Sequence, residues 1–260
     1  MLYLGDCLEI MPTLPAASVD LTVTSPPYDN LRTYNDTLND WTPAKWQAII
    51  AELYRVTKQG GVVVWVVGDA TVNGSETGTS FRQALYATVC GFRLHDTMIY
   101  HKEGPPLTHN RYEQKFEFMF VFSKGKPATF NGLREPAIYA GKSRASKTMR
   151  QDGDQLGNRS AKGVTADTRL RGNVWKINCQ NGGTADKIAN LHPAIFPEKL
   201  ASDQILSWSN PGDTVLDPFL GSGTTGKMAV AAGRQFIGIE RDPTYFEIAR
   251  KRIEPMPWDG

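Results

Sequence analysis

The segment Asp213-Thr-Val-Leu-Asp217-Pro-Phe-Leu-Gly221-Ser-Gly223-Thr-Thr-Gly226 decides the fold. A short apolar strand ends in an acid, and a glycine-rich turn then leads into a helix. Glycines let the backbone approach a ligand closely, and the N–H groups of the helix N-terminus point toward it. Glu240, which ends the next expected strand, is placed to accept both hydroxyls of a ribose. The spacing also fits a dinucleotide-binding turn, and a tight turn without any ligand is the plainer alternative.

Two details of this turn favour S-adenosylmethionine over a dinucleotide. The carboxylate of Asp217 suits the ammonium group of an amino acid and serves a pyrophosphate poorly, while Pro218 and Phe219 supply an apolar wall. The chain after Gly226 is too short to build the rest of a nucleotide-binding sheet. The other strands must therefore come from upstream, which makes the fold circularly rearranged relative to a common dehydrogenase.

Upstream of the turn, short apolar segments alternate with helix-like patterns, which predicts a largely parallel α/β sheet. We expect strands at residues 2–4, 19–24, 62–67, 92–100, 116–122, 214–216 and 236–239. Phenylalanines at 116, 118, 120 and 122 predict one apolar face for that strand. We expect helices at residues 43–58, 81–90, 197–209, 227–232 and 244–253, the first of them capped by Thr42.

Residues 125–172 have a different composition, with little periodicity and many Gly, Ser, Thr, Lys and Arg. We interpret them as an inserted, loop-rich module that is partly mobile when unbound. Residues 124–176 hold twelve Lys/Arg and four acids, whereas the remainder holds 17 basic and 23 acidic side chains. A basic module on a mildly acidic body favours a polyanionic partner.

The bulk composition is that of one large globular α/β domain that carries an insert. No apolar run approaches the roughly 20 residues of a membrane helix, and the N-terminus lacks the features of a secretory signal. Cys7, Cys90 and Cys179 form no CxxC pair, so a zinc site or disulfide framework is not expected. A reducing cytoplasm is the expected location.

A second motif, Ser25-Pro26-Pro27-Tyr28, directly follows the strand at 19–24. Two consecutive prolines fix φ, remove two donors and leave rigid carbonyl groups. The Ser25 hydroxyl and the Pro26 carbonyl can then accept two hydrogen bonds from a nucleobase amino group, which directs the nitrogen lone pair toward an electrophilic methyl group. Tyr28 can stack on the extruded base. A proline-stiffened strand exit with a packed tyrosine is the alternative reading.

Together, the two motifs resemble those of the β-class amino DNA methyltransferases of restriction-modification type. In that family a (Asp/Asn/Ser)-Pro-Pro-(Tyr/Phe) segment comes first, a target-recognition region next, and a DPFxGxGT cofactor segment last. The resemblance covers most of the chain outside 125–172. It implies a circularly permuted Rossmann-like methyltransferase fold, with catalytic half 1–124, target-recognition region 125–172 and cofactor-binding half 173–260.

The resemblance also implies roles for individual residues. Gly5-Asp6-Cys7 is similar to the family's segment near the cofactor adenine, and residues 192–198 (HPAIFPE) are similar to the segment before the glycine turn. Many relatives have Lys where Phe196 stands, so an apolar contact replaces a charged one. The implied cofactor-binding residues are Asp6, Cys7, Phe196, Asp217, Pro218, Phe219, Gly221, Ser222, Gly223, Thr224, Glu240 and Arg241, and the implied catalytic residues are Ser25, Pro26, Pro27 and Tyr28.

Within the family, Ser at the first position of the tetrad is typical of cytosine-N4 enzymes, with adenine N6 as the alternative. The HPAIFPE segment favours the same base. Methylation of cytosine C5 needs a cysteine nucleophile, which relatives that perform it place after a proline; none of the three cysteines follows one. RNA and protein methyltransferases with a similar tetrad carry the glycine turn before it, whereas here it comes after, which favours DNA.

A flipped base costs a few kcal/mol of unstacking, which contacts to the surrounding duplex must offset. Basic residues of the insert and Arg32 can contact phosphates, and some can read guanine edges. The expected DNA-binding residues are Arg32, Arg134, Lys142, Arg144, Lys147, Arg150, Arg159, Lys162, Arg169 and Arg171. A solvated basic loop without a ligand is the alternative. The histidines show no metal-ligand spacing, and no metal is expected.

The expected reaction is a direct, SN2-like methyl transfer from S-adenosylmethionine without a covalent enzyme intermediate. The expected partner is double-stranded DNA, with a cognate restriction nuclease as a candidate, for a monomer or homodimer that does not engage membranes. Two rivals remain: a nicotinamide-dependent oxidoreductase, which leaves the proline tetrad unexplained, and a non-catalytic DNA-binding protein.

Overall fold

The structure is a computed structural model that describes residues 1–28, 41–102, 112–152, 155–177 and 197–254. The chain forms two compact units. The main unit comprises Met1–Asn131 and Asn173–Gly260, and the insert unit comprises Gly132–Gly172.

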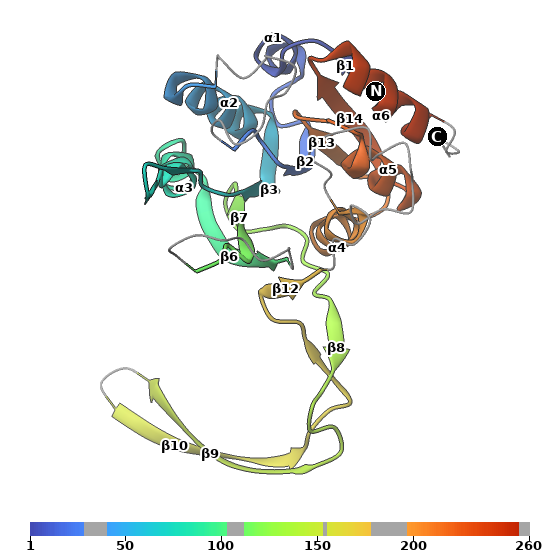
Figure 1. The fold of residues 1–260 in the computed structure, drawn as a ribbon. Coiled ribbons are helices and arrows are strands. Elements are labelled where there is room, and N and C mark those ends of the chain that lie inside the picture. Colours follow the sequence, from blue (N-terminus) through green and yellow to red (C-terminus); the bar gives the residue numbers. More distant parts are fainter. Residues whose placement is uncertain (29–40, 103–111, 153–154, 178–196, 255–260) are drawn as a thin grey trace. The chain divides into compact units, whose positions relative to one another are not determined.

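An eight-stranded sheet forms the centre of the main unit (Figure 1). Its strand order is β1 (Leu2–Leu4), β14 (Gln235–Glu240), β13 (Thr214–Asp217), β2 (Val19–Thr24), β3 (Thr57–Val67), β7 (Phe116–Ser123), β6 (Arg93–His101) and β12 (Val174–Lys176). Every neighbouring pair is parallel except the two pairs that β7 makes with β3 and β6. The expected, largely parallel α/β sheet is confirmed.

Three helices and a 3-10 turn pack together on one part of the sheet, and three helices pack together on the other (Figure 1). The first group is α1 (Cys7–Ile10), η1 (Met11–Thr13), α2 (Pro43–Val56) and α3 (Thr79–Val89); the second is α4 (Glu198–Trp208), α5 (Thr224–Ala231) and α6 (Pro243–Ile253). Thr42 caps α2, because its Oγ1 accepts a hydrogen bond of 3.3 Å from Lys45 N.

The strand order reverses direction between β13 and β2. From β13 the chain passes through α5 to β14 on one side, and from β2 it passes through α2 to β3 on the other. Val215 pairs with Leu21 and Leu216 with Thr22, so the two parallel strands end at the same edge. In open α/β sheets, ligands bind beyond the carboxyl ends of the strands at such a switch point.

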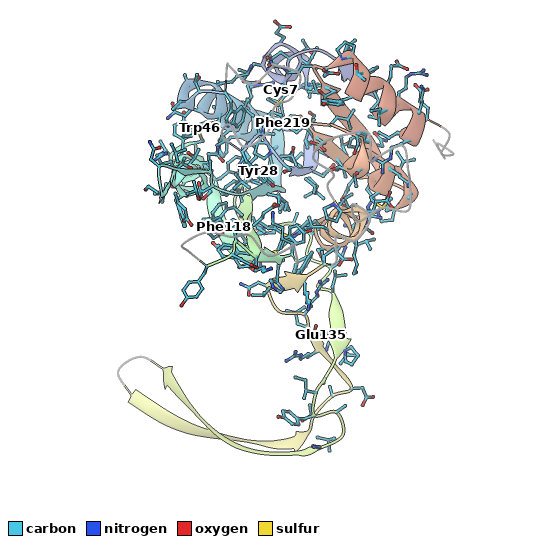
Figure 2. The ribbon with its side chains drawn as sticks, in the orientation of Figure 1. Cys7, Tyr28, Trp46, Phe118, Glu135 and Phe219 are labelled. Carbon is cyan, nitrogen blue, oxygen red and sulfur yellow. The ribbon has the colours of Figure 1, made fainter. Side chains whose placement is uncertain are left out.

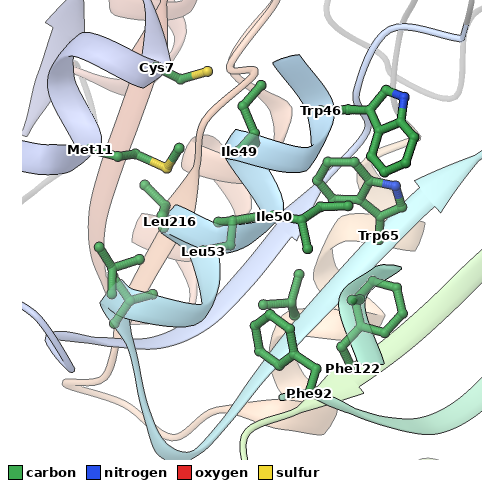
Figure 3. Close-up of a cluster of buried hydrophobic side chains, with 14 of the residues drawn as sticks. Cys7, Met11, Trp46, Ile49, Ile50, Leu53, Trp65, Phe92, Phe122 and Leu216 are labelled. Carbon is green, nitrogen blue, oxygen red and sulfur yellow. The ribbon is translucent and has the colours of Figure 1, made fainter. Parts of the chain in front are cut away.

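The core lies between α2 and the sheet (Figure 3). Ile49, Ile50 and Leu53 of α2 are buried, and they belong to one cluster with Trp65 of β3 and Phe122 of β7. Removing each such side chain from water contributes about 1.5–3 kcal/mol. This burial holds the strands whose ends carry the two motifs.

Two expectations about β3 and β7 have different outcomes. β3 begins at Thr57 rather than at Val62, because Thr57 already pairs with Val19 of β2. In β7 the expected apolar face is confirmed, because Phe118 and Phe122 flank Phe120 at ring-centroid distances of 5.2 and 6.2 Å.

The insert unit contains strands where the sequence analysis expected irregular loops. β9 (Ser143–Asp152) pairs antiparallel with β10 (Gln155–Val164), and β8 (Arg134–Pro136) pairs with β11 (Thr168–Leu170). Backbone ladders need no buried face, so a ribbon of this kind leaves little apolar periodicity in the sequence. A smaller hairpin, β4 (Thr71–Val72) with β5 (Ser75–Glu76), belongs to the main unit.

The insert unit begins at Gly132, later than the expected boundary at residue 125. Asn131 explains the difference: its backbone N–H donates to Ser207 O (2.8 Å), and its side-chain amide donates to Ser209 O (3.1 Å). These bonds tie the chain before Gly132 to α4. Among the described residues, no helix has the length and apolar character needed to span a membrane.

Candidate active site

The two sequence motifs meet at the carboxyl ends of β2 and β13. Thr24 Oγ1, on the last residue of β2, donates a 2.6 Å hydrogen bond to Asp217 Oδ1, on the last residue of β13. Thr225 Oγ1 donates to Val23 O at 3.2 Å. The tetrad and the glycine turn therefore start side by side, although almost 200 residues separate them in the chain.

Asp217 is a buried carboxylate, with a relative exposure of 4%. Burial raises its pKa to about 6, although hydrogen bonds from Thr24, Phe219 N and Thr225 lower it in part. No ion pair involves Asp217 within the described part of the chain. A cationic ligand group beside it would stabilise the ionised carboxylate.

Glu240 braces the glycine turn. Its Oε2 accepts from Gly221 N at 2.7 Å, and its Oε1 accepts from Asp242 N at 2.9 Å. Burial raises the pKa of Glu240, and the charges of Asp217 and Asp242 raise it further. Each carboxylate oxygen has a second lone pair, so Glu240 can still accept hydrogen bonds from ligand hydroxyls.

The glycines of the turn have structural reasons of their own. Gly221 and Gly223 have φ values of +52° and +81°. A Cβ on Gly223 would lie 2.8 Å from Ala249 Cβ, so α6 packs too closely for any side chain there. Gly223 is thus required by helix packing as well as by any ligand.

Ser222 and Thr224 are buried, and their hydroxyls accept hydrogen bonds of 3.2 Å from Arg252 Nη1. Arg252 also donates to the Ser222 carbonyl and, through Nη2, to Glu198 Oε1 (3.0 Å). The sequence analysis missed this residue, which holds the turn from the side of α6. Its apolar neighbours Ala249 and Ile253 are the signal that marks it as inward-facing.

Phe219 stands in an aromatic group at the switch point. Its ring centroid lies 5.7 Å from Trp41 and 6.2 Å from Trp65, both edge-on, and Pro218 beside it is buried. The apolar wall expected at these positions therefore includes Trp41, which the sequence analysis did not select.

Asp6 caps α1, because its Oδ1 accepts from Leu8 N at 2.9 Å, and its Oδ2 accepts from Lys45 Nζ at 2.9 Å. Burial opposes ionisation of Asp6, but the hydrogen bonds from Lys45 and Leu8 and the charges of Lys45 and Arg241 lower its pKa overall. The side chain of Cys7 lies in the core, where burial raises the pKa of its thiol to about 12. Arg241 is exposed.

Within the tetrad, Ser25 Oγ and Tyr28 Oη form a 2.9 Å hydrogen bond. Tyr28 Oη donates to Glu117 Oε2 at 3.0 Å, and the other oxygen of Glu117 pairs with Lys102 Nζ. Pro26 is buried, whereas Ser25, Pro27 and Tyr28 are partly exposed. The Tyr28 ring lies over Gly68, with Cδ2 3.6 Å from the position of a Cβ there, and Figure 2 shows Tyr28 and Phe219 in the main unit. Glu117 and Lys102 were not expected at the site.

Three expected DNA-binding residues are engaged within the insert unit. Arg134 Nε donates to Thr168 Oγ1 at 2.8 Å, Arg169 pairs with Glu135 at 2.7 Å, and Lys142 Nζ lies 5.3 Å from the centre of the Tyr139 ring. Arg171 is partly buried. The backbones of the other five lie on the ribbon, at Arg144, Lys147 and Arg150 of β9 and Arg159 and Lys162 of β10. Arg32 and Phe196 lie outside the described residues.

Comparison with known proteins identifies the family. Residues 19–251 match the N6/N4 methyltransferase family model, described as DNA methylase. The chain belongs to this family. It is 51% identical over 256 residues to the orphan methyltransferase M.BamHII of Bacillus amyloliquefaciens, covering 96% of this chain and 91% of that protein. It is 31% identical to the DNA adenine methyltransferase YhdJ of Escherichia coli K12, covering 96% and 81%.

Two solved structures share the fold of this methylase. The DNA modification methylase TTHA0409 of Thermus thermophilus, complexed with S-adenosyl-L-methionine, has a TM-score of 0.63 and 25% identity, covering all of this chain and 96% of that one. The cytosine-N4-specific PvuII DNA methyltransferase has a TM-score of 0.71 and 22% identity, covering 96% and 85%. The expected methyltransferase fold and family resemblance are confirmed.

The protein is an S-adenosylmethionine-dependent DNA methyltransferase of the amino-methylating type. The edge formed by β13 and β14 fits this cofactor, because Asp217 and Glu240 place two buried carboxylates where a cationic, hydroxyl-bearing molecule can bind. The oxidoreductase reading is thereby wrong.

Proposed function

We propose that this methylase transfers the methyl group to N4 of a cytosine that has been flipped out of double-stranded DNA. The single observation that supports it is the position of the Ser25 hydroxyl, a neutral acceptor one residue beyond the Thr24–Asp217 hydrogen bond. Adenine N6 is the second candidate, favoured by the relative that carries the name DNA adenine methyltransferase.

Each residue of the site has a separate task in this proposal. S-adenosylmethionine, when bound, supplies an electrophilic methyl group together with its own leaving group. Asp217 binds the cofactor's ammonium group, and Glu240 accepts hydrogen bonds from its ribose hydroxyls. Ser25 Oγ and the Pro26 carbonyl accept hydrogen bonds from the base amino group, and Tyr28 stacks on the base. The chain thus orients a lone pair and needs no nucleophile of its own.

The remaining assignments concern DNA. We propose that the basic residues of the β9–β10 ribbon contact phosphates of the target duplex, because a two-stranded ribbon fits the major groove and its charge favours a polyanion. Arg134 and Arg169 already form bonds within the insert unit, so their first task is to hold β8 against β11.

Nucleoside mass spectrometry of mixed-sequence DNA treated with the protein and S-adenosylmethionine tests the proposal. The expected product is N4-methylcytosine. N6-methyladenine alone would replace the assigned base, and 5-methylcytosine would contradict the assigned chemistry. Heat-treated protein serves as the control for methylation already present in the DNA.

A further inference from the structure

A chain of hydrogen bonds crosses the carboxyl edge of the sheet from β6 to β2. It runs from Lys102, directly after β6, through Glu117 of β7 and Tyr28 to Ser25, directly after β2. Glu117 pairs with Tyr100 of β6, which brings its carboxylate close to Lys102. The Glu117 and Lys102 side chains are 15% and 33% exposed, so both groups are partly shielded from water.

The chemistry of the end groups determines which atom donates in every bond of this chain. The Lys102 ammonium has only donors, and an ionised Glu117 carboxylate has only acceptors. Tyr28 has a single hydroxyl proton, which it donates to Glu117 Oε2. In the 2.9 Å bond between Ser25 and Tyr28, the proton must therefore come from Ser25.

We propose that Glu117 is a positioning residue that turns the Ser25 hydroxyl into a pure hydrogen-bond acceptor toward the base. Because Ser25 gives its proton to Tyr28, both acceptor lone pairs of its Oγ remain available to the amino N–H. If Tyr28 instead donated to Ser25, the Ser25 proton would be free to point at the amino nitrogen and would compete for its lone pair. This inference rests on the proposed amino-group methylation and assigns a role to a residue outside the tetrad.

Replacing Glu117 with Gln reverses the chain, and Lys102 is the reason. The Lys102 ammonium needs an acceptor, so it holds the amide oxygen of Gln and leaves the amide N–H₂ facing Tyr28. The amide then donates to Tyr28, the Tyr28 proton turns to Ser25, and Ser25 loses its acceptor character. The Glu117→Gln side chain has nearly the same size, so packing changes little.

The decisive experiment compares kcat for methylation of DNA in a double-mutant cycle of Glu117→Gln and Lys102→Met. We expect Glu117→Gln alone to lower kcat by more than about tenfold, a loss of ~1.4 kcal/mol in the transition state. In the Lys102→Met background the amide is free to flip and present its oxygen to Tyr28, so Glu117→Gln should cost less than about threefold. Glu113→Gln removes the same charge from a nearby carboxylate that pairs with Lys115, and it should leave kcat unchanged.

Two measurements separate positioning from structural damage. The melting temperature and the calorimetric affinity for S-adenosylmethionine should stay the same in Glu117→Gln, and in a Tyr28→Phe background Glu117→Gln should have no further effect. Equal losses in the Lys102 and Lys102→Met backgrounds, or an additive loss with Tyr28→Phe, would overturn the role of Glu117 while leaving the methylation reaction standing. Wild-type protein that methylates no amino group of DNA would overturn the proposed function and, with it, this inference.

Discussion

At the scale of single residues, Asp217 carries the most informative perturbation. Its burial raises the folded-state pKa to about 6, above the ordinary 3.8, so the folded protein holds this proton more firmly than the unfolded chain does. The associated stability is present below pH 3.8 and is lost as pH rises through about 6. Near neutral pH, the ionised carboxylate therefore costs stability in the cofactor-free protein.

Asp217→Asn should raise the free energy of unfolding of the cofactor-free protein above pH 7, by up to ~3 kcal/mol. The amide oxygen can still accept from Thr24 and Phe219 N, while the charge is gone. Denaturant unfolding at pH 8 and pH 4 measures this gain, which should shrink at the lower pH. A variant less stable than wild type at pH 8 would contradict the account of this carboxylate.

The same variant should bind S-adenosylmethionine more weakly, by at least about tenfold, because it lacks the charge opposite the ammonium group. For wild type, affinity should decline as pH falls below about 6, where Asp217 takes up a proton. Calorimetric titrations between pH 5 and pH 8 measure both effects. A pH-independent affinity in wild type would remove Asp217 from the cofactor site.

Ser25→Ala and Tyr28→Phe should behave in the opposite way. Both should lower kcat by about 100-fold or more, since they remove the acceptor for the base amino group or its orienting partner. Neither side chain is assigned to the cofactor, so the dissociation constant of S-adenosylmethionine should stay within about twofold. Equal losses in cofactor affinity and turnover would contradict the division of labour between the two motifs.

At the scale of elements, the glycine turn depends on the close packing of α5 against α6. Gly223→Ala should destabilise the protein by ~1–3 kcal/mol, because the added Cβ would meet Ala249 at 2.8 Å in a left-handed backbone conformation. Gly233→Ala is the matched control, with φ of +73° and its nearest atom, on Pro211, at 3.8 Å. Thermal unfolding should show the smaller loss for Gly233→Ala; equal losses would mean that backbone strain alone accounts for both.

Much of the element pattern could be predicted from the sequence. Strands and helices around the two motifs have clear apolar periodicity, and the chain order of the motifs implied that β13 would lie in the middle of a sheet completed from upstream. The β9–β10 ribbon has no such periodicity, so local sequence could not distinguish it from a loop. The antiparallel placement of β7 between β3 and β6 is likewise a long-range property.

Side chains that join the site from distant strands were the hardest to foresee. Glu117 lies in a strand recognised for its phenylalanines, and Arg252 is one of three consecutive basic residues in α6. Nothing in their local sequence shows that one reaches Tyr28 and the other the glycine turn. In contrast, Ser25 and Asp217 belong to compact motifs whose residue types already specify a chemistry.

At the scale of the whole molecule, the insert unit concentrates positive charge in a segment separate from the sheet that carries the site. Replacing Lys147 and Lys162 of the β9–β10 ribbon with Gln should weaken DNA binding across sequences. The slope of log affinity against log salt should fall by about one for each phosphate that these lysines neutralise in the wild-type protein. Fluorescence anisotropy with labelled duplexes at several salt concentrations measures the slope. An unchanged slope would exclude these lysines from the DNA interface.

The account depends on one site shared by the ends of β2 and β13. A crystal structure of the protein with bound S-adenosylmethionine tests it most directly. We expect the ammonium group at Asp217, the ribose hydroxyls at Glu240, and the methyl group directed toward the space beside Ser25. A cofactor that leaves Asp217 unoccupied, or that turns its methyl group away from Ser25, would contradict the central claim.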